Sequence, residues 1–154
     1  MIHRSLCLLA LCGLLISCAP EPKKEAPPVA ATPVVADESR RFPLANQVAT
    51  KVVQTQLMAK PFMPGGTVAN YKQGTKEWSL FLAKFPNATD AAIVLPDWRK
   101  ALADSKLEPS FGGYFGQDGG VPVFVFAKGA WIAGVKGLPE KDADAQARLL
   151  AAKL

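Results

Sequence analysis

The segment that most constrains the fold of this 154-residue chain is a proline-rich stretch at residues 19–41. It contains five prolines, neither glycine nor an aromatic residue, and four basic against four acidic side chains. Such a composition cannot bury enough apolar surface to form a core, so we expect a semi-extended spacer of about 3.1 Å per residue where it is polyproline-like. Residues 42–154 are therefore expected to form the folded domain.

Residues 1–17 have the organisation of a secretory signal. His3 and Arg4 precede an apolar run from Leu6 to Ile16, which is 11 residues long. A membrane-spanning helix needs about 18 to 20 apolar residues, whereas the apolar region of a signal peptide usually has about 7 to 15. The run is therefore typical of a cleaved export signal.

The end of this signal resembles the lipobox of bacterial lipoproteins, which Leu15-Ile16-Ser17-Cys18 fits at all four positions. The resemblance implies that Cys18 receives a diacylglyceryl thioether, that the chain is cut before it, and that the new amine is acylated. An ordinary signal cut after Ala19 is the alternative, but Pro20 would then follow the cut, which ordinary signal peptidases tolerate badly. The resemblance implies a lipid-anchored envelope protein, on the outer membrane facing the periplasm if the host has two membranes.

Cysteine and histidine are missing from the predicted mature domain. The cysteines are Cys7, Cys12 and Cys18, and the only histidine is His3. Two cysteines and the histidine leave with the signal, and Cys18 carries the lipid, so the domain has no disulfide and no thiol nucleophile. A Ser-His-acid triad and zinc or haem sites built on these ligands are excluded as well. We therefore expect no cofactor, no metal and no enzymatic activity.

The charge of the domain is mildly positive, with 13 basic and 9 acidic residues in 42–154. An excess of this size is most simply a solvated surface, although anionic lipid headgroups or envelope polyanions would also be attracted to it. Nucleic acid is not an expected partner in this compartment. The expected partners are the membrane, through the lipid on Cys18, and an envelope protein or polymer.

Helical spacing is clearest in two places. Thr89 is a plausible N-cap for a helix whose apolar residues recur at intervals of three and four up to Ser105, with Pro96 expected to kink or divide it. A last helix begins at Pro139, with acidic residues near its start. Residues 43–58 are ambiguous: helical spacing favours a helix, which we choose, whereas their β-branched residues favour a strand.

Strands are expected at 67–72, 78–85, 111–116, 121–127 and 130–136, and residues 60–66 are expected to be a loop. This order predicts a single small α+β domain, an antiparallel sheet of about five strands with two or three helices packed on one face. The strand at 121–127 is apolar on both sides. One side should contact the helices carrying Trp98 and Leu150. The other is either covered by residues 43–58, which we favour because large apolar patches are rare on soluble surfaces, or left open as a partner surface.

The glycine-rich stretch at 112–120 is the most unusual motif. Its glycines could let a ligand approach the backbone, so Tyr114 and Phe115 (as a stacking platform), Gln117 and Asp118 are weak ligand-binding candidates. The structural alternative is a short strand followed by a tight turn, with glycines supplying positive φ.

Three other groups were weighed as chemical sites. Met58 and Met63 could bind Cu(I), but core packing is the simpler interpretation. Asp97, Asp104 and Glu108, with Asp118 elsewhere, could pair as in glycoside hydrolysis, whereas exposed helix charges are simpler. Neither a Ser-x-x-Lys nor a Gly-x-Ser-x-Gly pattern occurs. The sequence thus favours a non-catalytic binding or structural module, with a small tethered hydrolase using Ser, Lys or carboxylates as the alternative.

Overall fold

The structure is a computed structural model that describes residues 34–154. The predicted signal, the predicted lipidation site Cys18 and the part of the predicted spacer up to residue 33 lie outside the described residues. Among the described residues, none of the helices combines the length and the apolar character that a membrane crossing requires.

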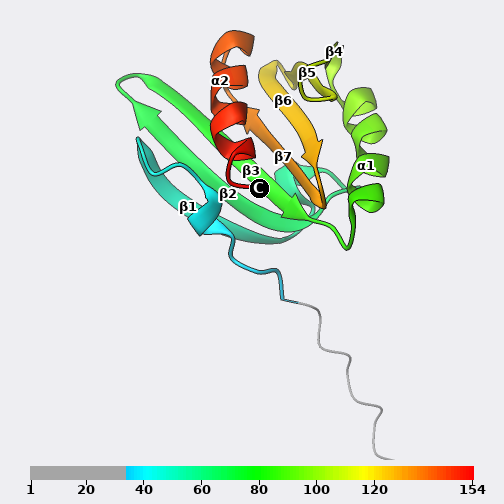
Figure 1. Ribbon diagram of the computed structural model, residues 1–154. Helices are drawn as coiled ribbons and strands as arrows, with labels where there is room; N and C mark the ends of the chain where they lie inside the picture. The colour runs from blue at the N-terminus through cyan, green and yellow to red at the C-terminus, as the bar shows by residue number, and fades with distance from the viewer. Residues whose placement is uncertain (1–33) are drawn as a thin grey trace, which may run out of the picture. The chain divides into compact units, whose positions relative to one another are not determined.

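The described residues form a seven-stranded antiparallel sheet in the order β1-β2-β3-β7-β6-β5-β4, with two α-helices (Figure 1). The α+β class and the single antiparallel sheet are confirmed, but the strands number seven rather than about five. The strands are β1 (Gln47–Thr55), β2 (Pro64–Gln73), β3 (Lys76–Lys84), β4 (Ala103–Glu108), β5 (Gly113–Asp118), β6 (Val121–Lys128) and β7 (Trp131–Lys136). The helices are α1 (Ala88–Ala101) and α2 (Glu140–Ala151), with short 3-10 turns η1 (Ser39–Arg41) and η2 (Leu57–Ala59).

The chain builds this sheet from two hairpin series that meet in the middle. Strands β1 to β3 are laid down in order, and α1 then carries the chain across to β4 at the opposite edge. Strands β4 to β7 return toward the centre, where β7 pairs with β3. The β5–β6 hairpin turns at Gly119-Gly120, which both have positive φ, as the Asp-Gly motif indicated.

Five local predictions differ from the structure. Residues 47–55 form the strand β1, so the β-branched residues outweigh the helical spacing. Pro64 to Gly66 begin β2 rather than ending a loop. The middle helix is capped by Asn87, whose Oδ1 accepts from the Asp90 N–H at 2.9 Å, and it runs through Pro96 as one helix. It ends at Ala101, and the residues after it form β4.

The two helices cover opposite faces of the sheet, contrary to the prediction that both pack on one face. Neighbouring side chains of a strand point to opposite sides. Val123 and Val125 therefore pack in the cluster with α1, and Phe124 and Phe126 pack in the cluster with α2. We call the two sides the α1 face and the α2 face. Residues 43–58 are consequently not the main cover of either face, although Leu57 packs in the α1-face core.

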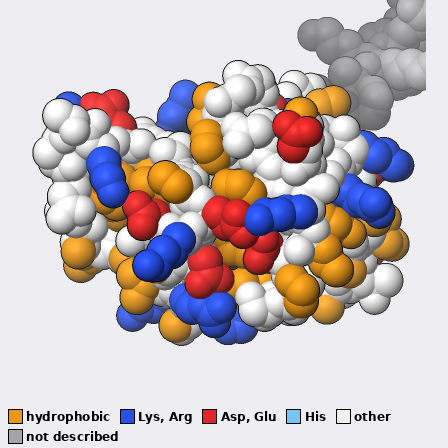
Figure 2. All heavy atoms as spheres, turned by 90° about the horizontal axis from the view of Figure 1, so that it is seen from above, with side chains coloured by type: hydrophobic (Ala, Val, Ile, Leu, Met, Phe, Trp, Pro, Cys, Tyr) orange, Lys and Arg blue, Asp and Glu red, His pale blue; other side chains and the backbone are white. Residues whose placement is uncertain are grey.

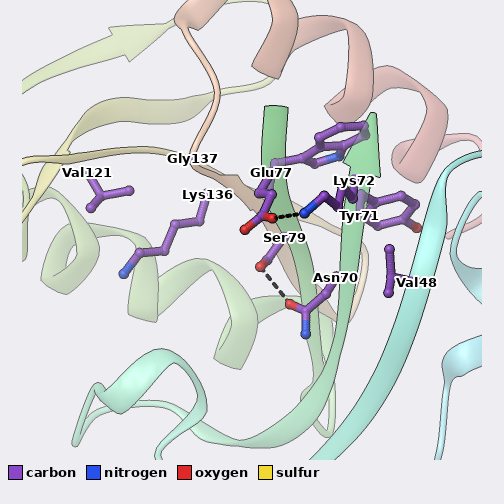
Figure 3. A pocket seen from close by; sticks show the side chains of 10 residues that line it. Val48, Asn70, Tyr71, Lys72, Glu77, Ser79, Val121, Lys136 and Gly137 are labelled. Carbon is purple, nitrogen blue, oxygen red and sulfur yellow. Dashed lines mark hydrogen bonds and ion pairs between the residues drawn. The ribbon is translucent and has the colours of Figure 1, made fainter. Parts of the chain in front are cut away.

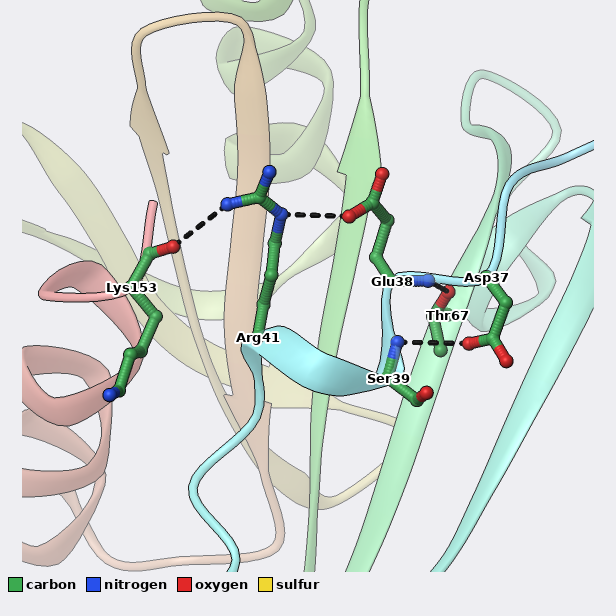
Figure 4. Close-up of polar contacts among 6 residues, drawn as sticks. All are labelled: Asp37, Glu38, Ser39, Arg41, Thr67 and Lys153. Carbon is green, nitrogen blue, oxygen red and sulfur yellow. Dashed lines mark hydrogen bonds and ion pairs between the residues drawn. The ribbon is translucent and has the colours of Figure 1, made fainter.

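The residues before β1 complete the α2 face. Phe42 is 2% exposed in the α2-face core. The Tyr71 hydroxyl donates to the Pro43 carbonyl at 2.8 Å, and burial raises the pKa of Tyr71 to about 12. The Glu38 N–H donates to Thr67 Oγ1 at 3.1 Å (Figure 4). These contacts place residues 34–41 with the domain, ahead of the boundary expected at residue 42.

Candidate functional site

The α1 face is covered only in part. Helix α1 lies over β4 to β7, and the η2 segment, with the buried Leu57 and Met63, contributes to the core on this side. The remaining surface over β1, β2, β3 and the end of β7 is an open groove of about 520 Å³ (Figure 3). We call it the open groove. Its lining residues are Val48, Asn70, Tyr71, Lys72, Glu77, Trp78, Ser79, Val121, Lys136 and Gly137. Two of them, Tyr71 and Trp78, also belong to the α2-face core, so the groove reaches the edge of that core.

The floor of the open groove is polar. Asn70 and Ser79 are opposite each other on β2 and β3, and the Ser79 hydroxyl donates to Asn70 Oδ1 at 2.8 Å. One step along the same pair of strands, Lys72 Nζ lies 2.6 Å from Glu77 Oε1. The hydrogen bond from Lys72 and its positive charge lower the pKa of Glu77. The floor thus offers an amide, a hydroxyl and charges of both signs to a bound molecule.

A network of three charges adjoins the groove through Lys136, which is one of its lining residues. Asp118 at the end of β5 accepts from Lys60 Nζ at 2.7 Å and from Lys136 Nζ at 3.2 Å. Burial by itself would raise the pKa of Asp118, but the hydrogen bonds and charges of the two lysines outweigh it and lower the pKa. Asp118 therefore remains ionised and joins the loop before β2 to the end of β7.

The four ligand-binding candidates of the glycine-rich stretch do not come together. Tyr114 is opposite Val125 and lies on the α1 face, whereas Phe115 is opposite Phe124 and lies on the α2 face. The two rings therefore do not form one stacking platform. Gln117 is half-buried on the same strand. Of the four, only Asp118 borders the open groove, through Lys136.

The carboxylates considered for hydrolysis are also separated. Asp97 pairs with Lys100 at 3.2 Å, and Asp104 is the second residue of β4, with a φ of 50°. Glu108 instead lies beside Glu140 of α2, and burial together with Glu140 raises the pKa of Glu108.

The cavity at this carboxylate pair is too small for a substrate. Its volume is about 10 Å³, and its lining residues are Glu108, Phe115, Phe124, Glu140 and Asp144. That is roughly the space of one water molecule. Figure 2 looks onto the end of the molecule that is uppermost in Figure 1 and shows acidic and basic side chains intermingled. Cations also pair with these carboxylates at the surface, because Lys106 Nζ lies 2.5 Å from Glu140 and Arg148 Nε lies 2.9 Å from Asp144.

The methionines belong to the core. Met63 is 3% exposed, and its Sδ accepts from Trp98 Nε1 at 3.2 Å. Met58 is half-buried against the same cluster. These contacts support core packing rather than a Cu(I) site. Within residues 34–154, no three His, Cys, Asp or Glu side chains gather so as to hold a metal ion.

Sequence reasoning missed the groove residues Asn70, Ser79 and Lys136. A partial signal was present in β3, where Glu77 and Ser79 occupy the side that further along carries Phe81 and Ala83. That change from polar to apolar along one side indicates a strand whose face is only half covered. No protein-family model, curated protein or solved structure matches the chain.

Proposed function

We propose that the protein is a lipid-anchored envelope module that binds an extended polypeptide segment of a partner protein in the open groove, without catalysis. The observation that carries this proposal is the unequal cover of the two sheet faces. The α2 face is covered by α2 and the residues before β1, apart from a pocket of about 240 Å³ beside α2, whereas the polar end of the α1 face is left open as a groove of about 520 Å³. A surface that the domain does not use for its own core is available to a partner.

The chemistry of the groove favours a polypeptide over a uniformly charged polymer. Glu77 and Asp118 neutralise the lysines beside them, so the groove presents no strong field of one sign. Val48 and Val121, which are 66% and 36% exposed, add apolar contacts at its margins. Among the described strands, β1 pairs only with β2, so its outer edge is free for an added strand.

A hydrolase is less well supported by the same residues. Ser79 and Lys136 are opposite each other on β3 and β7, as a serine–lysine pair would require. However, the Ser79 hydroxyl donates to Asn70, and Lys136 Nζ is held at 3.2 Å from Asp118. Within residues 34–154, no base therefore accepts the hydroxyl proton of Ser79, and the cavity at the Glu108–Glu140 pair is too small for a substrate.

The anchor is tested at Cys18. Replacing it by Ala should block lipid attachment and leave either an uncleaved precursor or a soluble protein. Each buried CH₂ of a lipid chain contributes about 0.8 kcal/mol, and two or more chains are needed for a stable anchor. Mass spectrometry and membrane fractionation measure the change. If mass, processing and fractionation all stay the same, the lipoprotein proposal is wrong.

The binding role is tested by photo-cross-linking in intact cells. A photoreactive residue at Asn70, on the groove floor, should form an adduct with a polypeptide. The matched control is Thr50, an exposed residue of β1 whose partner Ala69 belongs to the α2-face core, so Thr50 lies on the other side of the sheet. Adducts at neither position, or equally at both, would contradict the proposal, and so would a glycan adduct at Asn70.

A further inference from the structure

Basic side chains gather at one end of the α2 face, around Trp131. Lys84 on β3 and Lys128 on β6 are both opposite Trp131 in the sheet register. The guanidinium carbon of Arg41 lies 4.6 Å from the centre of the Trp131 ring, and Lys84 Nζ lies 5.6 Å from it. Arg41 Nη1 donates to the Lys153 carbonyl at 2.9 Å (Figure 4). We call Arg40, Arg41, Lys84, Lys128 and Lys153 the basic end.

The basic end differs from the rest of the surface in how its charges are balanced. Elsewhere in residues 34–154, Lys51, Arg99 and Lys141 have no carboxylate within ion-pair distance, whereas seven cations do: Lys60, Lys72, Lys76, Lys100, Lys106, Lys136 and Arg148. At the basic end, only Arg41 has such a partner among the described residues, Glu38 at 2.8 Å. Asp37 is the nearby acid in sequence, and its Oδ1 accepts from the Ser39 N–H. A local excess of positive charge therefore remains.

Part of this charge has a structural role. Arg41 and Lys128 donate to the carbonyls of Lys153 and Ala151, at the end of α2 where backbone acceptors are otherwise unpaired. Arg40, Lys84 and Lys153 are exposed and have no ion pair within the described residues. These three side chains remain available to an external anion.

The basic end also adjoins the part of the chain that leads toward Cys18. Arg40 follows Val34, the first described residue, by only six positions. Residues 19–33 separate the described domain from Cys18, and fifteen residues span at most about 54 Å when fully extended. A lipid on Cys18 would thus hold the basic end near the membrane surface at a high effective concentration.

We propose that the basic end binds the anionic phospholipid surface of the membrane to which the protein is anchored. This inference rests on the proposed lipid at Cys18. The open groove lies on the opposite face of the sheet, because Ser79 and Lys84 are an odd number of residues apart on β3 and their side chains therefore point to opposite faces. It also lies toward the other end of the strands, because the two residues are five positions apart. Docking through the basic end therefore leaves the groove open to a partner.

The test uses the mature chain carrying Cys18→Ser, so that the lipid does not contribute to binding. It should sediment with vesicles that contain phosphatidylglycerol, should not sediment with pure phosphatidylcholine vesicles, and should be released by salt. Each exposed cation near an anionic surface is worth about fivefold in binding. The combined change Arg40→Gln, Lys84→Gln and Lys153→Gln should therefore weaken binding by about 100-fold.

The matched control removes the same charge elsewhere, through Lys51→Gln, Lys100→Gln and Lys141→Gln, which change exposed residues of β1, α1 and α2. It should retain most of the binding, and thermal unfolding verifies that both variants fold. If vesicle binding weakened equally in the two variants, binding would depend on net charge alone and the proposal would be overturned. Absence of vesicle binding, or tighter binding to soluble polyphosphate than to vesicles, would overturn it as well. Lipid attachment to Cys18 in cells is measured separately by mass spectrometry. Absence of the lipid anchor can therefore be distinguished from absence of membrane binding by the basic end.

Discussion

The two faces of the sheet are built from the same strands but are finished differently. On the α2 face, one continuous core extends from Phe42 across the sheet to Leu150, and Tyr71 stacks on Trp78 at 5.3 Å within it. On the α1 face, the core stops partway along β3, beyond Phe81, and the open groove begins at Ser79. The comparison indicates that the α2 face mainly stabilises the domain, whereas part of the α1 face is available for binding.

The strand sequences already contain this difference. In β3, the residues Trp78, Leu80 and Leu82 are all apolar and all lie in the α2-face core. The alternate residues change from Glu77 and Ser79 to apolar side chains along the same strand. The alternation of side chains along a strand therefore indicates which face is buried. It also indicates how far along the strand other elements cover that face.

The largest expected effects come from the two covered cores. Trp98 is fully buried on the α1 face and stacks on Phe81 at 5.5 Å, and Phe126 is fully buried on the α2 face. Trp98→Ala and Phe126→Ala should each lower the free energy of unfolding by about 3 to 5 kcal/mol, because both leave large cavities. Urea unfolding measures the loss. Ile93→Ala is the control, since Ile93 is 64% exposed and should change stability by less than about 0.5 kcal/mol.

If only one of the two core variants were strongly destabilised, the faces would not be equally covered over β6. A stable Trp98→Ala variant would mean that α1 is loosely attached, and the open groove would then extend further across the sheet. A stable Phe126→Ala variant would instead transfer the candidate binding surface to the α2 face.

A smaller effect is expected where the α1-face core is tightest. A Cβ atom at Gly134 of β7 would lie 2.4 Å from the Phe81 ring and 2.4 Å from the Phe124 carbonyl oxygen. Gly134→Ala should therefore destabilise the domain by about 1 to 3 kcal/mol through overpacking. The second-site change Phe81→Leu should recover part of the loss, because it removes the ring contact but not the backbone contact. A neutral Gly134→Ala would show that this part of the face has room to spare.

The sequence predicted the elements that local patterns specify. The strands β6 and β7, the turn at Gly119-Gly120 and the helix after Pro139 follow from apolar alternation, glycine positions and charge order, and they are confirmed. The two edge strands were missed. β1 has β-branched residues at helical spacing, and β4 follows α1 without a glycine or proline to mark the break. Pairing with the neighbouring strands, which is a tertiary effect, decides both cases.

The candidate site was less accessible to sequence reasoning than the fold. Asn70, Ser79 and Lys136 are separated by many residues and meet only because β2, β3 and β7 pair in one register. The glycine-rich stretch attracted attention because its composition is unusual, but its glycines serve the β5 strand and its turn. Composition identified a local conformational requirement there. The groove has only a partial local signature, the change from polar to apolar residues along one side of β3, because its residues meet through pairing across strands.

The ion pairs of Asp118 lie at the boundary between the covered and open parts of the α1 face. Asp118→Asn should cost about 1 to 2 kcal/mol, because the group is only partly buried and loses two charged hydrogen bonds. The pKa of Asp118 is lowered, so its stabilisation is fully present above the ordinary value of 3.8 and is lost as the pH falls through the lowered pKa. Unfolding measured across pH should show a constant difference near neutrality that closes in acid. A difference that grows in acid would contradict this assignment.

The smallest effect on stability is expected in the open groove itself. Asn70 is exposed, Ser79 is half-buried, and the two share one hydrogen bond. Asn70→Ala and Ser79→Ala should each change the free energy of unfolding by less than about 0.5 kcal/mol, because no core contact is lost. Both should nevertheless reduce capture of the partner by a cross-linker placed next to them, at Lys72. Retained stability together with lost capture would define the groove as a binding surface. A large loss of stability would instead mean that these residues stabilise the sheet, so that both faces contribute to the stability of the domain.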